Sequence, residues 1–325
     1  VSISKCHVTA RSMVKKSRQF LGQKRRALAL RQSRNRVKAA IGPSFYKDIQ
    51  SLRIACFPNH LEPSESVDSY GYAMQKILAC LSIRPQPFDP MKPYELVIDW
   101  QDLTQSMIDT AHYAAQAAGN FGQPAPVVLN ARCVDISKQA VAAAFETAFG
   151  YPVDLDPTKH HGPAVMKSDR NAAHDGQIVQ CPLAPKDVRD GYVYSHVINN
   201  IHDGFAVDLR LIYIKGVLPV FYRKKRPEKD RFLSMNTHMA VAETAEFFSA
   251  EEITMIDQFC ASLGADYGEL DTLRDKQTGK LYVVDIAKTP FGILYGIKRS
   301  ERARAMEQIS AAFAKRVLAP LITTS

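Results

Sequence analysis

Before the midpoint of the chain, continuous hydrophobic runs alternate with runs at helical spacing. Continuous apolar runs at 52–57, 94–100 and 126–131 predict short buried strands. Between them, 68–81 and 104–120 place apolar residues three and four positions apart, which predicts helices. This alternation predicts a small parallel sheet flanked by helices. The sequence has no GxGxxG motif, so the fingerprint of a dinucleotide-binding fold is missing.

From residue 160 on, the pattern changes to strands with hairpin turns, preceded by one predicted helix and interrupted by another. The helix predicted over 135–150 ends at Gly150, and the helix over 248–264 has Ser249 and Glu252 at the capping-box positions. Strand-rich sequence of this kind predicts an α+β region, distinct from the α/β front. Strands are predicted at 164–168, 177–183, 192–198, 205–214, 217–225, 266–275 and 280–287, with a hairpin turn at Lys215-Gly216 and a last helix at 301–317.

The bulk composition is that of a globular protein with two or three compact units. The 325 residues are 46% hydrophobic and 23% charged. No apolar run approaches the roughly 20 residues that cross a bilayer. The six cysteines form no CxxC pair and no Cys/His pair at zinc spacing. We therefore expect reduced thiols and a cytoplasmic protein.

The net charge of +9 is concentrated in a basic segment at the start of the chain. Residues 1–50 contain 13 Lys or Arg and one acid, Asp48, which gives +12 and leaves −3 for the remaining 275 residues. Residues 20–40 are rich in helix formers, so a basic helix is predicted. It can bind an acidic partner or an anionic membrane surface, or pack on the body of the protein. Its Arg/Ser-rich composition also resembles a transit peptide. No specific nucleic-acid motif accompanies it, and a homodimer is left open.

Three groups of charged residues could carry chemistry. Lys167 ends an apolar strand and precedes a polar loop, 168–176, a position that suits phosphate binding. Asp208 and Arg210 alternate on one strand, so both side chains point to one face of a sheet, which is also the pattern of a solvated ion pair.

The third group is a pair of carboxylates, Asp271 and Asp285, on two apolar strands joined by a turn near 275–279. Counting outward from the turn predicts that they lie near each other. Two adjacent carboxylates require a neutralising cation or base unless both are solvated. Mg²⁺ favours such a sparse carboxylate site when substrate phosphates complete it.

In this order the three groups resemble the ATP-grasp superfamily, with the ribosomal-protein glutamate ligase branch as the most similar pattern. The resemblance covers about 126–295. It implies an ATP-grasp fold, preceded by a small Rossmann-like α/β domain and a basic helical N-terminal extension. The expected units are 1–50 (extension), 51–125 (front domain), 126–200 (linker and lid subdomain) and 201–325 (C-terminal subdomain).

The resemblance also implies roles for individual residues. ATP and Mg²⁺ would be the cofactors. Lys167 would hold the α- and β-phosphates, and Asp208 would contact the ribose. The strand around Ser195, His196 and Val197 would contact adenine. Arg210, Arg223 and Asn236 would act near the phosphate or acyl group, and Asp271 and Asp285 would bind the metal.

One position departs from the family pattern. Ala287 stands where the family has a metal-binding Asn, and alanine cannot coordinate a metal. Asp285 replaces the commoner and longer Glu. The loop 168–176 has a single glycine, Gly176, where the family has more.

The implied activity is an ATP-dependent carboxylate–amine or carboxylate–thiol ligase that acts through an acylphosphate. Lys167→Ala or Asp271→Asn is expected to abolish ATP turnover and leave the fold intact. His174 and Asp175 are a candidate base, while His160-His161 are expected to be a connection and not a metal site. The alternatives are a small-molecule kinase of the same fold and a degenerate nucleotide-binding module whose basic N-terminus recruits a partner. The sequence names neither the carboxylate substrate nor the amine-type acceptor.

Overall fold

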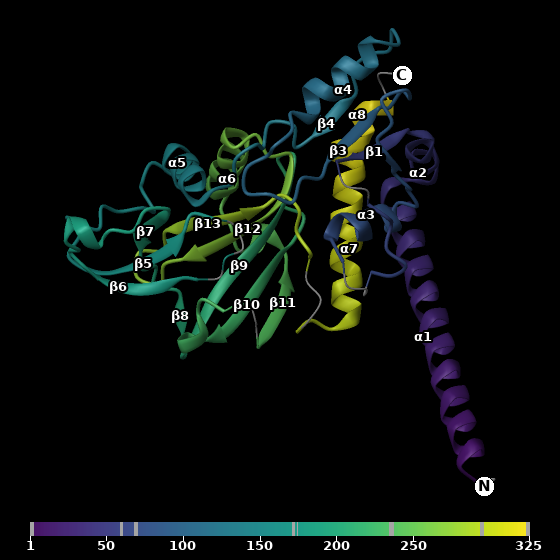
Figure 1. Cartoon of the computed structure of the whole chain (residues 1–325), viewed down its shortest axis with the longest axis horizontal. Helices are drawn as coiled ribbons and strands as arrows, with labels where there is room; N and C mark the ends of the chain where they lie inside the picture. Colours follow the sequence, from purple (N-terminus) through teal and green to yellow (C-terminus); the bar gives the residue numbers. More distant parts are fainter. Residues whose placement is uncertain are drawn as a thin grey trace.

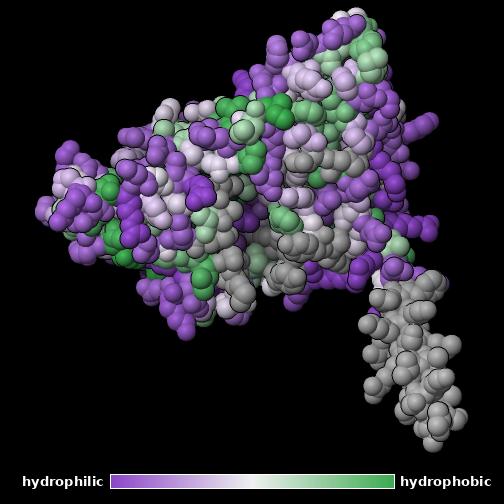
Figure 2. Space-filling model, in the orientation of Figure 1, coloured by the Kyte–Doolittle hydropathy of each residue, from purple (hydrophilic) through white to green (hydrophobic). Residues whose placement is uncertain are grey.

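The structure is a computed structural model that describes residues 3–58, 61–67, 71–170, 173, 175–233, 237–292 and 296–322, with side chains from residue 22 onward. The described residues form three sheets with helices between and beside them (Figure 1). Within the described parts of the chain, no helix is both long and apolar enough to cross a membrane. Figure 2 shows that one face of the molecule is mainly hydrophilic, with hydrophobic residues gathered near α4, β4 and α6.

The front of the protein is a parallel sheet of four strands in the order β2-β1-β3-β4. This confirms the parallel sheet predicted from the alternating pattern. The sheet extends past residue 125, because β4 pairs with β3. The strand β2 was not predicted, since two residues carry no periodicity. The elements are β1 (Ile54–Phe57), α3 (Ala73–Cys80), β2 (Gln86–Pro87), β3 (Leu96–Asp99), α4 (Thr110–Gly119) and β4 (Val127–Leu129).

A three-stranded antiparallel sheet in the order β6-β5-β7 follows the helix α5. The Ser137 hydroxyl accepts a hydrogen bond from the backbone N–H of Ala140, and Gly150 has a φ of 75°, a left-handed conformation that glycine adopts readily. Both ends of the predicted helix are therefore confirmed to within a few residues. The elements are α5 (Lys138–Phe149), β5 (Gly162–Ser168), β6 (Gln177–Cys181) and β7 (Tyr192–His196).

The largest sheet is antiparallel throughout, in the order β11-β10-β9-β12-β13, with β8 paired to β9. The predicted turn at Lys215-Gly216 is confirmed. Its two residues have φ values of 37° and 83°, which is the twist that a two-residue hairpin requires. The elements are β8 (Ile201–His202), β9 (Phe205–Ile214), β10 (Phe221–Pro227), β11 (His238–Ala242), α6 (Ala250–Ser262), β12 (Tyr267–Arg274) and β13 (Leu281–Ala287).

The basic N-terminal segment forms a long helix, α1 (Ile3–Ile41), that packs on the body near its C-terminal end (Figure 1). Leu30, Ser33 and Val37, spaced for one helical face, are buried against the neighbouring helices. Residues 23–28 are exposed. Part of the helix is thus a packed element, and part presents its basic side chains to solvent. The other terminal helices are α2 (Pro43–Asp48), α7 (Arg299–Phe313) and α8 (Ala319–Ile322).

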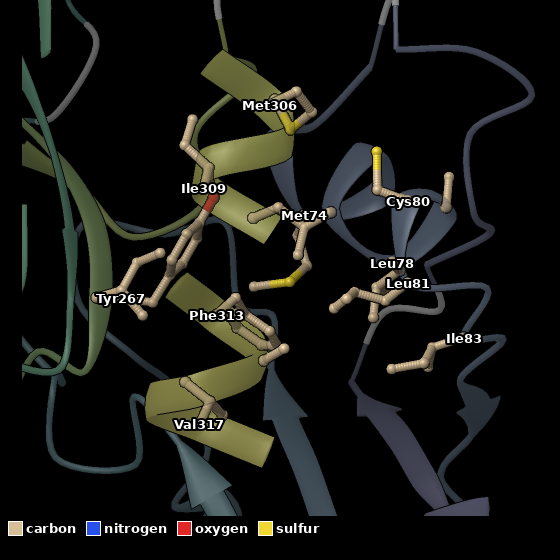
Figure 3. Packing of buried hydrophobic residues seen from close by; sticks show 14 of the residues in the cluster. Met74, Leu78, Cys80, Leu81, Ile83, Tyr267, Met306, Ile309, Phe313 and Val317 are labelled. Atoms are coloured by element: carbon tan, nitrogen blue, oxygen red, sulfur yellow. The ribbon is translucent and has the colours of Figure 1, made fainter. Parts of the chain in front are cut away.

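The helix α7 connects the front sheet to the large sheet through one hydrophobic core. Figure 3 shows Met74 of α3 and Phe313 of α7 packed together, with Tyr267 of β12 beside the same helix. All three side chains are fully buried. Each such burial contributes on the order of 1.5–3 kcal/mol. The two sheets therefore belong to one packed body.

The capping box of α6 provides a first prediction about stability. The Ser249 hydroxyl accepts from the backbone N–H of Glu252 at 3.1 Å, and the Glu252 carboxylate accepts from the Ser249 N–H at 3.0 Å. A Ser249→Ala variant is expected to lose about 1 kcal/mol of unfolding free energy, measured by urea denaturation. Ser262→Ala, at the exposed end of the same helix, is the matched control. Equal stability of the two variants would contradict the capping role.

Candidate active site

Charged side chains gather on one face of the large sheet because the strands are in a common register. Asp271 on β12 lies directly opposite Arg210 on β9 and directly opposite Asp285 on β13. Asp208 on β9 lies opposite Lys224 on β10. The predicted proximity of the two aspartates is confirmed, as is the shared face of Asp208 and Arg210.

The other face of the same sheet is apolar, which explains the segregation of charge. Leu209, Leu211 and Leu270 alternate with the charged residues and are buried in a core that includes α5 and α6. A strand places successive side chains on opposite faces. The charged face is therefore fixed by the leucine pattern, since a shift of one residue would bury every charge.

Asp271 is the centre of a partly buried ion-pair network. Arg210 donates to both of its oxygens, at 3.0 and 2.7 Å, and Lys224 donates to Oδ1 at 2.6 Å. Burial alone would raise the pKa of Asp271, but Arg210 and Lys224 outweigh it and hold this pKa well below the usual range. Burial, and then repulsion from Arg210, lowers the pKa of Lys224. Asp271 is thus a carboxylate at any physiological pH.

Glu269 is a further acid of this face that the sequence analysis missed. It lies two residues before Asp271 on β12 and is only 3% exposed. Its Oε2 accepts a long hydrogen bond of 3.4 Å from Nη1 of Arg210. Burial raises the pKa of Glu269, and Arg210 opposes that shift. The Arg210 guanidinium is therefore held by two carboxylates, which fixes its plane.

Lys167 reaches this face from the three-stranded sheet. Its Nζ donates to the backbone carbonyl of Val284 at 3.3 Å, next to Asp285. Burial lowers the pKa of Lys167, and the charge of Asp285 opposes that shift. The structure therefore brings Lys167, Arg210, Asp271 and Asp285 together, as the sequence analysis expected.

A second lysine, Lys138, also contacts Asp285. Lys138 is the first residue of α5, and its Nζ donates to both Asp285 oxygens, at 3.1 and 3.2 Å. Sequence reasoning missed it, because 147 positions separate the partners and an N-terminal helix lysine has no local signal. Lys138 and Lys167 thus place two ammonium groups beside one carboxylate.

Asp208 is held at the edge of the cluster. Arg226 forms an ion pair with it, and Asn200 Nδ2 donates to its Oδ1 at 3.0 Å. Burial raises the pKa of Asp208, while Lys224 and Arg226 oppose the shift. Contact with a ribose hydroxyl stays a prediction.

Arg223 does not join the cluster. It lies opposite Leu209 in the register of β10 and β9, so it shares the face of the leucines, and Lys224 occupies the charged face instead. The expectation for Arg223 fails because the run of four basic residues, 223–226, hides the phase of the strand. Pairing with Asp208 would have identified Lys224.

Other expected site residues are only partly described. Ser195 lies opposite Val165 on β5, on the same face as Lys167. His196 contacts the ring of His160, with centroids 5.6 Å apart, and burial lowers its pKa. Val197 follows the end of β7. Adenine contact by 195–197 stays a prediction. Asn236 and His174 lie outside the described residues.

The donor set fits a magnesium ion bound together with phosphates. Asp271 and Asp285 are opposed, and Mg²⁺ commonly takes one or two carboxylates with water and phosphate oxygens. Among the described residues, no three His, Cys, Asp or Glu side chains converge on one point as a metal site. Ala287, directly opposite Glu269, contributes no ligand. The two aspartates would therefore hold the ion only with phosphates present.

Asp154, near Lys167, is expected to make the stability of the protein depend on pH. Burial raises its pKa to about 6, and Lys167 opposes that shift. Folding raises the pKa of this acid. The contribution of Asp154 to the free energy of unfolding is therefore complete below about pH 4 and is lost as pH rises through about 6. The loss is at most about 2 kcal/mol after solvent screening. Asp154→Asn should flatten unfolding free energy measured between pH 4 and 8, and an unchanged slope would contradict the assignment.

No family model matches the sequence. No curated protein matches it. Among the solved structures that it resembles are ATP-grasp ligases, the class that the sequence motifs resemble.

Three of these structures have similar scores. A RimK domain ATP-grasp protein from Sphaerobacter thermophilus has 14% identity and a TM-score of 0.48, covering 82% of this chain and 99% of that one. The ATP-grasp ligase PsnB complexed with a minimal precursor has 14% identity and a TM-score of 0.47, covering 74% and 92%. The D-cycloserine synthetase DcsG has 13% identity and a TM-score of 0.47, covering 75% and 93%. None of these values assigns a substrate to this chain.

Proposed function

We propose that this protein is an ATP-dependent ligase of the ATP-grasp type that joins a carboxylate to an amine-type acceptor. The observation that carries the proposal is the convergence of Lys138, Lys167 and Arg210 on two opposed aspartates. The ammonium and guanidinium groups can pair with the phosphate oxygens of a triphosphate, and the paired carboxylates can bind its magnesium ion. The order of these residues in the sequence supports the same class.

In the proposed reaction a substrate carboxylate oxygen attacks the γ-phosphorus of ATP. A new O–P bond forms, the bond from that phosphorus to the β–γ bridging oxygen breaks, and ADP leaves. The amine nitrogen then attacks the acyl carbon, the bond to the phosphate oxygen breaks, and the amine loses a proton to solvent. The products are an amide, ADP and phosphate.

The residues of this chain would act by position and charge. Lys167 and Lys138 would bind phosphate oxygens, since one ammonium group contacts Asp285 and the other contacts the carbonyl of the preceding residue, Val284. Arg210 keeps unused N–H groups on Nη1 and Nη2 that can face the transferred phosphoryl group. Bound Mg²⁺ would neutralise phosphate charge between Asp271 and Asp285.

A screen for ADP release tests this proposal. The protein is incubated with Mg-ATP, a panel of carboxylates and a panel of amines, and the products are identified by mass spectrometry. ADP formation with an amide product is expected. ADP with a phosphoester product would instead show a small-molecule kinase.

One observation favours a second candidate, a nucleotide-binding module without turnover. Both oxygens of Asp271 accept from protein cations, and Ala287, which lies opposite Glu269, supplies no metal ligand. A metal would have to compete with Arg210 and Lys224 for this carboxylate. ATP binding by calorimetry, with no ADP release in the full screen, would select this candidate. The exposed basic residues of 23–28 could then recruit an acidic partner or a membrane surface.

A further inference from the structure

The segment that follows β13 is joined to the carboxyl edge of the front sheet. Thr289 Oγ1 donates to Asp102 Oδ1 at 2.5 Å, just after the end of β3. Lys288 Nζ donates to Ser106 Oγ at 2.7 Å and to the Cys133 carbonyl at 3.2 Å. Ligands of parallel α/β sheets bind outside the carboxyl ends of the strands. This junction therefore lies where a substrate of the front domain is expected.

Aromatic side chains from three segments meet at the junction. The Tyr72 ring lies 4.4 Å from the Phe291 ring and 5.3 Å from the Trp100 ring, centroid to centroid. Phe291 is 41% exposed, whereas Trp100 is buried beneath. The Tyr72 hydroxyl donates to Asp102 Oδ2 at 3.0 Å. The aromatic surface and the carboxylate are thus bound to each other, and both reach solvent.

The charge presented outward at the junction is negative. Asp102 is exposed, and each of its oxygens accepts one of the hydrogen bonds above, which leaves lone pairs for a further donor. The neighbouring Lys288 is buried, and its ammonium group is directed to Ser106 and Cys133. A carboxylate beside aromatic faces attracts an organic ammonium ion by charge-assisted hydrogen bonding and by cation–π attraction. It would repel a second carboxylate.

The junction is within reach of the phosphate site. Thr289 follows Asp285 by four residues, which span at most about 14 Å when extended. An acceptor whose ammonium group is held at Asp102 can therefore extend a second, reacting amine toward the acyl group activated beside Asp285. We propose that Asp102, Tyr72 and Phe291 form the subsite that recognises the acceptor, a compound that carries an aromatic or apolar group and an ammonium group separate from the amine that reacts. The assignment of this subsite to the acceptor rests on the proposed ligase function.

The test measures binding of three probes of the same shape to the full chain by calorimetry at pH 7.5. The probes are 2-phenylethylamine, which is charged, 2-phenylethanol, which is neutral, and 3-phenylpropionate, which is anionic. The amine is expected to bind at least about tenfold more tightly than the alcohol, since one charge-assisted contact is worth about that factor. Equal binding of the amine and the alcohol, or preferred binding of the carboxylate, would overturn the proposal.

Variants assign the effect to named residues. Asp102→Asn should weaken amine binding about tenfold and leave alcohol binding unchanged. Asp48→Asn, which removes one exposed carboxylate elsewhere, should change neither. Phe291→Leu keeps an apolar surface but removes the aromatic ring, so it should weaken binding of the amine and leave binding of the alcohol unchanged. Amine binding that is insensitive to Asp102→Asn and Phe291→Leu would place the probe elsewhere and refute the subsite.

Titration with a non-hydrolysable ATP analogue separates the two proposals. If the analogue binds and the amine does not, the subsite is wrong and the nucleotide site stands. If the amine binds through Asp102 and the analogue does not, the proposed ligase function is wrong, while the ammonium site stands.

Discussion

A Lys167→Ala variant is expected to release ADP about 10²–10³-fold more slowly than the unmodified protein, with its unfolding free energy nearly unchanged. The factor is typical of removing one preorganised charge from a transition state. The structure explains why stability should survive. The ammonium group makes a hydrogen bond of 3.3 Å to a backbone carbonyl, and burial lowers its pKa, so its charge is costly in the free protein.

The measurement is ADP release at saturating Mg-ATP together with urea denaturation. Lys186→Ala removes an exposed lysine from the same part of the chain and serves as control, with both readings unchanged. If Lys167→Ala releases ADP at the rate of the unmodified protein, Lys167 does not act in the phosphate site. Loss of turnover together with several kcal/mol of stability would assign it a structural role instead.

Asp271→Asn is expected to lower both turnover and stability, the latter by about 3–5 kcal/mol. The expectation from sequence, that this variant leaves the fold intact, is revised by the ion pairs. Asn cannot carry the charge that offsets Arg210 and Lys224, and removing it leaves the buried Lys224 and the half-buried Arg210 without their closest carboxylate. Because Asp271 has a depressed pKa when folded, its contribution is complete above about pH 4 and is lost only as pH falls further.

The stability difference between the unmodified protein and Asp271→Asn should therefore be constant from pH 6 to 8 and shrink below about pH 4. Adding Lys224→Met to Asp271→Asn should restore part of the stability, since it removes one uncompensated cation, while turnover stays low. A difference that grows with pH above 6, or a double variant that is less stable than Asp271→Asn alone, would contradict this account of the network.

Much of the fold could be predicted because its signals are local. The turn Lys215-Gly216 and the cap at Ser249 require particular residues at particular positions, and both are where the sequence placed them. The facing of Asp271 and Asp285 followed from counting along two strands from one turn. Such inferences need only neighbouring residues and the two-residue repeat of a strand.

The missed parts of the candidate site depend on partners far apart in sequence. Lys138 meets Asp285 because α5 packs beside β13, which no local pattern encodes. Arg223 and Lys224 are chemically similar neighbours, so only the register with β9 decides which faces the cluster. Glu269 was hidden because a lone acid in a strand usually indicates a solvated face, whereas here it is buried.

The packing of α1 against the body of the protein limits how far the chain can be shortened from its N-terminus. Leu30, Val37, Tyr46 and Ile49 all precede the front sheet, yet they are buried in the core that contains α3 and α7. A protein that starts at residue 51 would lack these buried side chains, and the exposed apolar surface of α3 and α7 would favour self-association. A shortened protein should instead begin near residue 22, which keeps the part of α1 that contains Leu30, Ser33 and Val37.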